Sequence, residues 1–295
     1  MKKFLIKISV FALLLLGLLI FTFIGLKIAV NQLSSFTTKK DNIKYLIAGH
    51  SIPECAYNDL YIDNSFNIAN SGESYFYTYL KLKYIFSKKN DFNTVFIEFT
   101  NNLVSKEMDN WIWGKKNMEH KFPKYFAFTS IDDLVLLLIN NPKNFLNTLS
   151  LTLKHNLKTI IIGNLSLIDD FGGYLELDKT IDINKINTEA LTEKDNSNYS
   201  KYNIEYLKKI IELCHVNGIK IILIRSPLHE AYRANISDSL MLSIKEQEFS
   251  DLYFIDFADI ELEDTDFADL KHLNKNGAEK ISKHFNSYLH NKLEN

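Results

Sequence analysis

The sequence predicts an α/β domain built on a parallel sheet, and two observations carry that prediction. Short apolar runs of the kind that form strands buried on both faces recur along the chain, as in Thr94–Glu98. Segments with helical spacing separate these runs, and a repeated strand, helix, strand order implies parallel pairing with right-handed crossovers. With 295 residues, 46% of them hydrophobic, the chain is long enough for one sizeable domain with its own core.

The N-terminus, residues 1–30, is predicted to be a membrane anchor. Ile8–Leu26 contains no charged residue, and its length approaches the roughly 20 residues that cross a bilayer as a helix. Lysines precede it, which favours a cytoplasmic N-terminus with the rest of the chain on the periplasmic or extracellular side. A retained signal anchor is favoured over a cleaved signal peptide, because no convincing small-x-small cleavage site follows. Residues 31–42 are predicted to be a linker that lifts the domain, residues 43–295, off the bilayer.

Five strands and four main helices are predicted within the domain. The strands are Ile43–Ala48, Phe66–Ala69, Thr94–Glu98, Ile219–Ile224 and Leu252–Phe257. The helices are Ser74–Ser87, Tyr202–Val216, Ser237–Glu248 and Leu273–Leu293.

Residues 111–200 interrupt this alternation and are predicted to be an insertion. Ile131–Ile139 and Phe145–Leu153 have helical patterns, and the first is predicted to be a buried helix because its apolar run is too short for a second membrane span. Asp178–Ser200 is predicted to be a surface loop. From its position we expect the insertion to roof the functional site and to set specificity, since loops commonly carry function.

Ser51 is the first candidate functional residue. It lies in Gly49-His50-Ser51, where the first strand breaks into a turn before a predicted helix. Ligands of open α/β sheets bind at the carboxyl ends of strands, and a helix start offers free N–H groups that suit an oxyanion. Serine is also a common helix N-cap, so this stretch alone leaves Ser51 as either a nucleophile or a cap.

Three later stretches form a pattern with Ser51: Asn67–Ser74 after the second strand, Phe99–Asn102 after the third, and Asp269–Asn274 before the last helix. This order of serine, glycine, asparagine and Asp-x-x-His resembles the SGNH (GDSL-like) hydrolase superfamily. From Tyr45 onward the chain is similar to its membrane-anchored envelope branch, which includes alginate acetylation and teichoic acid D-alanylation proteins. The resemblance implies a three-layer α/β/α sandwich with a flavodoxin-like sheet, and it is weak across the insertion.

The resemblance also implies a role for each matching residue. Ser51 would be the nucleophile, His272 its general base and Asp269 the partner that orients His272. The backbone N–H groups of Ser51 and Gly72 and the side-chain amide of Asn101 would form the oxyanion hole.

Each of these residues also has a purely structural interpretation. Gly72 permits a turn with positive φ, Asn101 suits a helix cap, and His272 is one of 8 histidines. Asn102 and Asp266 are second choices for the amide donor and for the partner of the base, because their positions do not match the motif.

The chain departs from the family pattern at His50, where the family has an aspartate. That aspartate shapes the active-site loop and is not a triad member, so His50 is a candidate for substrate contact or for loop support. Arg225 is a candidate for binding an acidic glycan, because a guanidinium fork suits carboxylates. Bracing of the loop is the alternative for Arg225 and for Arg233.

Cys55 is a poor competitor to Ser51 as a nucleophile. It lies about one helical turn further on and so points away from the strand end. Cys214 is predicted to be a buried core residue. Two cysteines are no disulfide framework, and whether they pair outside the cytoplasm stays open.

The composition excludes several functions. A formal net charge of -2 leaves no broad basic surface for nucleic acid. No P-loop, dinucleotide fingerprint or metal-site spacing occurs, so no cofactor is predicted.

The residues and the resemblance together predict a membrane-anchored serine esterase or O-acyltransferase. Its substrates would be O-acyl groups, foremost acetyl, of an envelope or extracellular polysaccharide. Its partners would be the acylated carbohydrate or acyl donor, the membrane and other polysaccharide-modifying proteins. The alternative is a non-catalytic carbohydrate-binding or assembly protein. His50 favours that alternative, and the presence of Ser51, Asp269 and His272 opposes it.

Overall fold

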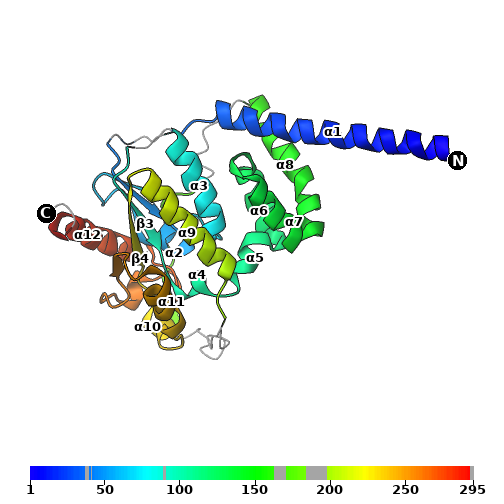
Figure 1. Ribbon diagram of the computed structural model, residues 1–295. Helices are drawn as coiled ribbons and strands as arrows, with labels where there is room; N and C mark the ends of the chain where they lie inside the picture. Colours follow the sequence, from blue (N-terminus) through cyan, green and yellow to red (C-terminus); the bar gives the residue numbers. More distant parts are fainter. Residues whose placement is uncertain (37–39, 41, 89–90, 163–170, 184–197, 293–295) are drawn as a thin grey trace.

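A five-stranded sheet forms the centre of the domain (Figure 1). The computed structural model describes residues 1–36, 40, 42–88, 91–162, 171–183 and 198–292. The strand order is β2-β1-β3-β4-β5, and all four pairings are parallel. The strands are β1 (Tyr45–Ala48), β2 (Ser65–Asn67), β3 (Thr94–Glu98), β4 (Lys220–Arg225) and β5 (Phe254–Asp256). The predicted α/β class with a parallel sheet is therefore confirmed.

Both faces of the sheet are covered by apolar cores. Successive strand residues point to opposite faces. Leu46 and Val95 accordingly belong to one core cluster, whereas Tyr45 and Phe96 belong to the other. This explains why the strands read as continuous apolar runs.

The main helices of the domain divide between these two cores. They are α2 (Ser51–Ala56), α3 (Tyr75–Lys88), α9 (Lys201–Val216), α11 (Ser239–Phe249) and α12 (Lys275–Lys292). Residues of α3, α9 and α11 contribute to the first core, and residues of α2 and α12 to the second. Three short elements, α4 (Asn101–Val104), α10 (Glu230–Arg233) and the 3-10 helix η4 (Asp264–Asp266), lie in the connections.

The predicted strands and main helices are all present, with shifts of a few residues at their ends. The second strand ends at Asn67 and not at Ala69. The side-chain oxygen of Asn67 accepts the N–H of Ala69 at 2.8 Å, and its amide donates to the carbonyls of Pro53 at 3.0 Å and Tyr57 at 2.7 Å. A side chain that bonds its own backbone two residues on turns the chain out of the strand.

The insertion between β3 and α9 is mostly helical where it is described. Its elements are α5 (Met108–Trp113), α6 (Lys115–Tyr125), the 3-10 helix η1 (Phe126–Phe128), α7 (Ile131–Asn140) and α8 (Pro142–Ile162). The prediction that Ile131–Ile139 is a buried helix was wrong, because Ile131 is 78% and Ile139 73% exposed. Most of the predicted Asp178–Ser200 loop, residues 184–197, lies outside the described residues.

The N-terminal helix α1 (Lys2–Leu33) is long and apolar enough to cross a membrane. It projects away from the domain (Figure 1). The predicted linker, residues 31–42, does not lift the domain away from this helix. Val30 at the end of α1 and Phe36 just after it are both buried in the first core. Of the predicted linker, residues 37–39 and 41 lie outside the described part of the chain.

Candidate active site

Ser51 begins α2 at the carboxyl end of β1. The strand order reverses direction at β1, and such switch points are where open α/β sheets bind ligands. Gly49 makes the turn possible, since its φ is +154° and an added Cβ would lie 2.6 Å from the Cβ of Glu98. A glycine therefore lets the chain pass close to β3 before it enters α2.

His50, and not Ser51, caps α2. The ring Nδ1 of His50 accepts the N–H of Ile52 at 3.1 Å. This bond assigns the remaining ring proton to Nε2, which is buried and has no hydrogen-bond partner among the described residues. Burial lowers the pKa of His50 to about 3, and the neighbouring His272 and Lys271 act in the same direction, so the ring is neutral. The Ser51 hydroxyl is thereby free of the capping role.

Ser51, His272 and Asp269 form a chain of two hydrogen bonds. Ser51 Oγ lies 2.8 Å from His272 Nε2, and His272 Nδ1 lies 2.9 Å from Asp269 Oδ1. Asp269 Oδ1 also accepts the backbone N–H groups of Lys271 and His272, each at 3.0 Å. Burial by itself would raise the pKa of Asp269. The hydrogen bonds from His272 and from the two backbone groups outweigh burial and hold that pKa below its ordinary range.

This arrangement can activate a hydroxyl as a nucleophile. With an ionised Asp269, the proton on His272 is held at Nδ1, which leaves Nε2 to accept the hydroxyl proton of Ser51. The three residues that the sequence pattern grouped are thus brought together, although Ser51 and His272 are 221 positions apart.

The loop that carries Asp269 and His272 is fixed on both sides. The N–H of Ala268 donates to the carbonyl of His272 at 2.8 Å, and Phe267 and Leu273 form an antiparallel bridge. The side-chain oxygen of Asn274 accepts the N–H groups of Asn276 at 3.0 Å and Gly277 at 3.2 Å, and so caps the start of α12. His272 and Asp269 are therefore held by backbone geometry.

The predicted oxyanion donors differ in how they are placed. Gly72 has a φ of +71°, a backbone conformation that favours glycine. A Cβ added there would lie no closer than 3.8 Å to any neighbouring atom, so there is room for a side chain at this position. Asn101 directs its amide to Asp238 Oδ1 at 2.6 Å. The structure therefore assigns Asn101 a bond to the polar cluster described next, and records no contact between Asn101 and Ser51.

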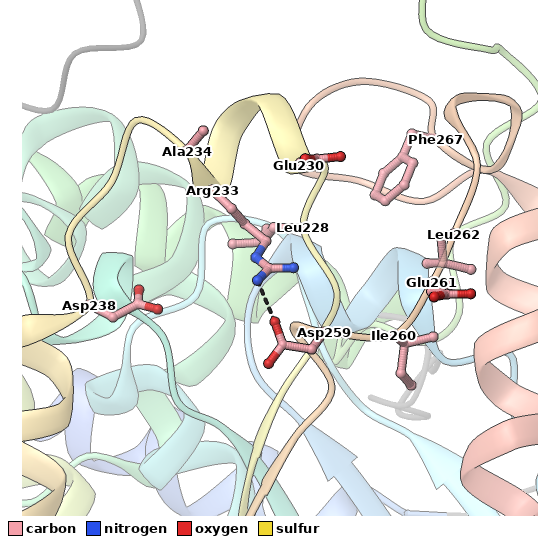
Figure 2. Close-up of a pocket in the computed structure, with 10 residues that line it drawn as sticks. All are labelled: Leu228, Glu230, Arg233, Ala234, Asp238, Asp259, Ile260, Glu261, Leu262 and Phe267. Carbon is pink, nitrogen blue, oxygen red and sulfur yellow. Dashed lines mark hydrogen bonds and ion pairs between the residues drawn. The ribbon is translucent and has the colours of Figure 1, made fainter.

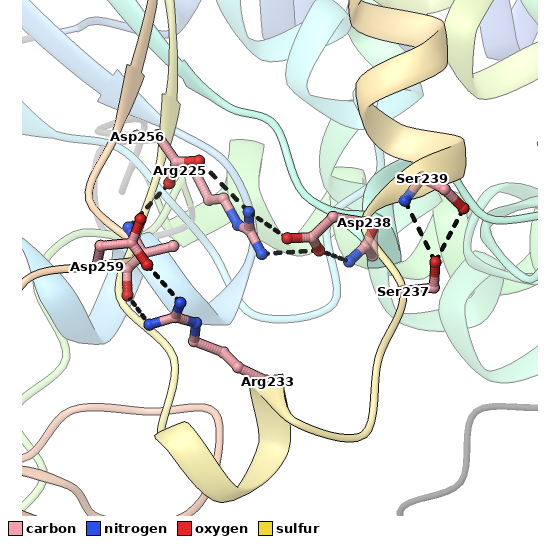
Figure 3. Close-up of polar contacts among 9 residues, drawn as sticks. Arg225, Arg233, Ser237, Asp238, Ser239, Asp256 and Asp259 are labelled. Atoms are coloured by element: carbon pink, nitrogen blue, oxygen red, sulfur yellow. Dashed lines mark hydrogen bonds and ion pairs between the residues drawn. The ribbon is translucent and has the colours of Figure 1, made fainter.

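Arg225 braces the ends of two strands (Figure 3). It is buried as the last residue of β4, and its guanidinium contacts Asp238 at 2.8 Å and Asp256 at 3.4 Å. These contacts correspond to the bracing alternative and not to glycan binding. Arg233, which is more exposed, pairs with Asp259 at 2.5 Å in the same region (Figure 3).

An open cleft of about 510 Å³ lies beside this cluster (Figure 2). Arg233 and Asp259 line it from one side and Phe267 from another, with further carboxylates at its rim. Ser51, His272 and Asp269 are not among its lining residues. The cleft is therefore a neighbour of the Asp269–His272 loop and is not lined by the Ser51 hydroxyl.

The second choices for the site residues have other roles. Asp266 bonds the N–H of Glu263 at 2.9 Å and Lys280 at 2.8 Å, so it is not the partner of His272. Cys55 and Cys214 are both free and buried, so they do not pair. Burial raises the pKa of each thiol to about 12, which leaves Cys55 without nucleophilic character at neutral pH.

Residues 171–183 are the described part of the insertion that borders the site. The N–H of Gly173 donates to the carbonyl of Ala69 at 3.0 Å, and Ile181 donates to Phe267 at 2.9 Å. Lys179 lies 3.5 Å from Asp269 Oδ2. This segment therefore borders the loop that carries Asp269, and a roof over the site stays a prediction.

Glu98 is a site residue that sequence reasoning missed. It ends β3 directly behind Gly49 and is fully buried. Ser226 donates to its two carboxylate oxygens, from the backbone at 3.0 Å and from the hydroxyl at 2.6 Å. Burial raises the pKa of Glu98 to about 7 although these hydrogen bonds oppose the shift. An ionisable residue at the end of an otherwise apolar strand was the available signal.

The pKa of Glu98 predicts a pH-dependent stability. The folded state raises this pKa from 4.5 to about 7. The protonated carboxyl of Glu98 therefore makes its full contribution to the stability of the folded state below about pH 4.5. That contribution is lost as the pH rises to about 7. The difference is on the order of 3 kcal/mol. Glu98→Gln cannot ionise, so its free energy of unfolding should lack this decline. Chemical unfolding of both proteins between pH 4.5 and 8 checks this, and parallel stability curves would contradict it.

A buried ion pair that the sequence did not reveal holds the loop that carries Gly72. Lys81 Nζ and Glu73 Oε2 are 2.5 Å apart, and both side chains are inaccessible to solvent. The ammonium also donates to the carbonyls of Ile68 at 2.5 Å and Phe171 at 2.7 Å, and Glu73 accepts the hydroxyl of Tyr125. The pair joins α3, α6 and the segment after residue 170 to this loop.

Comparison with known proteins adds little. A model of an uncharacterised protein family matches residues 166–294, less than half of the chain. That range includes Asp269 and His272 but not Ser51. No curated protein matches the chain.

Proposed function

We propose that this chain is a serine esterase or O-acyltransferase of the SGNH type, with a three-layer α/β/α sandwich and a flavodoxin-like sheet. The observation that carries the proposal is the hydrogen-bonded chain from Ser51 through His272 to Asp269, with distances of 2.8 and 2.9 Å. These distances match the requirement that a general base lie within hydrogen-bond reach of the proton it removes.

In the proposed reaction, Ser51 Oγ attacks the carbonyl carbon of an acyl ester while its proton passes to His272 Nε2. The tetrahedral intermediate then collapses, the ester C–O bond breaks, and the leaving alcohol takes the proton from His272. Water or a sugar hydroxyl resolves the acyl-serine by the same steps in reverse. Asp269 stays ionised and stabilises the imidazolium. The backbone N–H groups of Ser51 and Gly72 are the proposed oxyanion donors.

The proposed substrate is an O-acyl group, foremost acetyl, on an envelope or extracellular polysaccharide. This part rests on the resemblance and on the N-terminal helix, which can hold the domain at a membrane. The lysines that precede the uncharged stretch of this helix favour a cytoplasmic N-terminus and a domain outside the cytoplasm.

Labelling with a fluorophosphonate probe tests the proposal, because such probes react with activated serines. The full chain in detergent should be labelled, whereas Ser51→Ala and His272→Ala should not. Ser287→Ala is a matched control, since its exposed hydroxyl donates to the carbonyl of Lys283 within α12. Labelling that persists in Ser51→Ala would refute the assignment of the nucleophile. An unlabelled but folded wild-type protein would favour the binding role instead.

A further inference from the structure

Helix α7 turns its apolar side outward. Its buried residues include Asp133, which accepts the N–H of Ser130 and the hydroxyl of Tyr206. Its exposed residues include four large apolar side chains at helical spacing, Ile131, Val135, Leu138 and Ile139. A continuous apolar stripe of this kind is characteristic of a surface that has a partner other than water.

Helix α8, which contacts α7, also exposes apolar side chains. It packs on α6 with its buried face, which carries Phe145, Thr148, Thr152 and Asn156. The opposite face exposes Leu146, Leu151, Leu157, Ile161 and Ile162 together with Lys143, Lys154 and Lys158. A lysine beside apolar residues can lay its stem along an apolar surface while its ammonium group reaches the headgroups of a bilayer. We call the nine exposed apolar residues of α7 and α8 the α7–α8 face.

The membrane anchor docks directly beside this face. Helix α1 contacts η1 and α8, and the rings of Phe23 and Phe126 lie 5.6 Å apart, edge to face. Lys27, one turn further along α1, donates to the carbonyl of Thr129. Thr129 in turn lies two residues before α7 begins.

The length of α1 indicates how deep in a bilayer the contacts of Phe23 and Lys27 would lie. Lys7 and Lys27 bound the uncharged stretch, and a helix rises about 30 Å between them, which is about the thickness of the hydrocarbon core. Lys27 therefore lies at the boundary of the hydrocarbon when α1 spans the bilayer, and Phe23 lies inside it. Because Phe126 and Thr129 contact these two residues, α7 begins at the level of the membrane surface.

The arrangement of the helices agrees with this depth. In Figure 1, α7 and α8 lie on the side of the domain toward which α1 projects, and α8 runs across the direction of α1. Its exposed face is opposite α6 and therefore directed away from the sheet.

We propose that the α7–α8 face is a second membrane-contacting surface, whose partner is the same lipid bilayer that α1 spans. The two helices lie in the interface, with their apolar side chains among the acyl chains and their lysines among the headgroups. The domain is then held flat on the membrane at three helices instead of moving freely on a tether. This inference does not depend on the proposed chemistry or on which side of the membrane the domain occupies.

A small cavity at the same level indicates which headgroups suit this surface. It has a volume of about 170 Å³ and is lined by Lys27, Lys83, Ser87 and Thr129, among others. Two ammonium groups and two hydroxyls suit the phosphate of an anionic lipid. Vesicles that contain phosphatidylglycerol are therefore the appropriate membrane for a test.

The test places a fluorophore on the α7–α8 face of the full chain. Ile139→Cys and Ile161→Cys are labelled with an NBD dye, which fluoresces at shorter wavelength in apolar surroundings. The native thiols are buried, with pKa values of about 12, and so stay unlabelled. Val216→Cys is the control, because Val216 is 72% exposed as the last residue of α9, a helix that lies apart from α7 and α8 in Figure 1.

After reconstitution into phosphatidylcholine and phosphatidylglycerol vesicles, nitroxide-labelled lipids should quench the dye at Ile139→Cys and Ile161→Cys at least threefold more than at Val216→Cys. Both dyes should also emit at shorter wavelength than the control. Equal quenching and emission at all three positions would overturn the inference, because the face would then lie in water. Blue-shifted emission without lipid quenching would overturn it as well, because a protein surface would then cover the face.

Discussion

His272→Ala is expected to slow acylation of Ser51 by about 10⁵–10⁶-fold, because the hydroxyl loses the imidazole nitrogen that lies 2.8 Å from it and is assigned to take its proton. Asp269→Ala should cost about 10⁴-fold, since it acts through His272. The double variant should be no slower than His272→Ala alone, because residues that act as one unit are not additive. Burst-phase hydrolysis of 4-nitrophenyl acetate by the full chain measures these rates.

Asp269→Asn separates charge from geometry in the same assay. All three recorded hydrogen bonds from residues 271 and 272 end on Oδ1, and an asparagine oxygen can accept the same three bonds. The variant therefore keeps the orientation of the ring and loses only the negative charge that stabilises the imidazolium. We expect its rate to lie between those of the wild type and Asp269→Ala.

His290→Ala is the matched control for these variants. His290, on α12, also holds its Nε2 3.0 Å from a carboxylate, that of Asp63, but both side chains are exposed. Its loss should leave the acylation rate within about twofold, as expected for surface changes. A rate of His272→Ala within tenfold of wild type, in a folded protein, would contradict the assigned base.

Lys81→Met is expected to lower the free energy of unfolding by about 3–5 kcal/mol, because it leaves the carboxylate of Glu73 buried without its counter-charge. The lost bonds to the carbonyls of Ile68 and Phe171 add to this cost. For a domain of this size the melting temperature should fall by about 10 °C. Thermal unfolding in detergent, followed by circular dichroism, measures the change.

Two further variants make this prediction specific. Lys81→Met combined with Glu73→Gln should recover much of the loss, since the second change removes the unpaired charge and keeps an acceptor for Tyr125. Lys208→Met removes an ammonium from an exposed pair, 2.6 Å from Glu248, and should change stability by less than about 0.5 kcal/mol. Equal effects of Lys81→Met and Lys208→Met would show that burial of the first pair does not matter.

The sequence determined the elements whose signal is local. The apolar runs of β1, β3 and β4 are buried on both faces of the sheet, which is why they read as strands without alternation. The uncharged stretch before Lys27 likewise identified a helix that can span a membrane. The motif pattern also selected Ser51, Asp269 and His272, which the fold places within hydrogen-bond reach of one another.

Only the tertiary structure decided which polar groups meet away from that motif. Lys81 lies on a helix with apolar neighbours, and nothing in its spacing identifies Glu73 as a buried partner. Asn101 matches a donor position, yet its amide meets Asp238, which is 137 positions away in the chain. Such contacts depend on how separate elements pack, and no local pattern encodes them.

The environment of α7 shows the same limit most clearly. Its apolar residues predict a helix, and the helix is present from Ile131 to Asn140. Periodicity tells which side of a helix avoids water, but a protein core and a lipid bilayer satisfy that side equally well. The contacts of α1 with η1 and α8 bring α7 close to the helix that can span a membrane. The apolar side of α7 faces outward, where the sequence alone predicted burial.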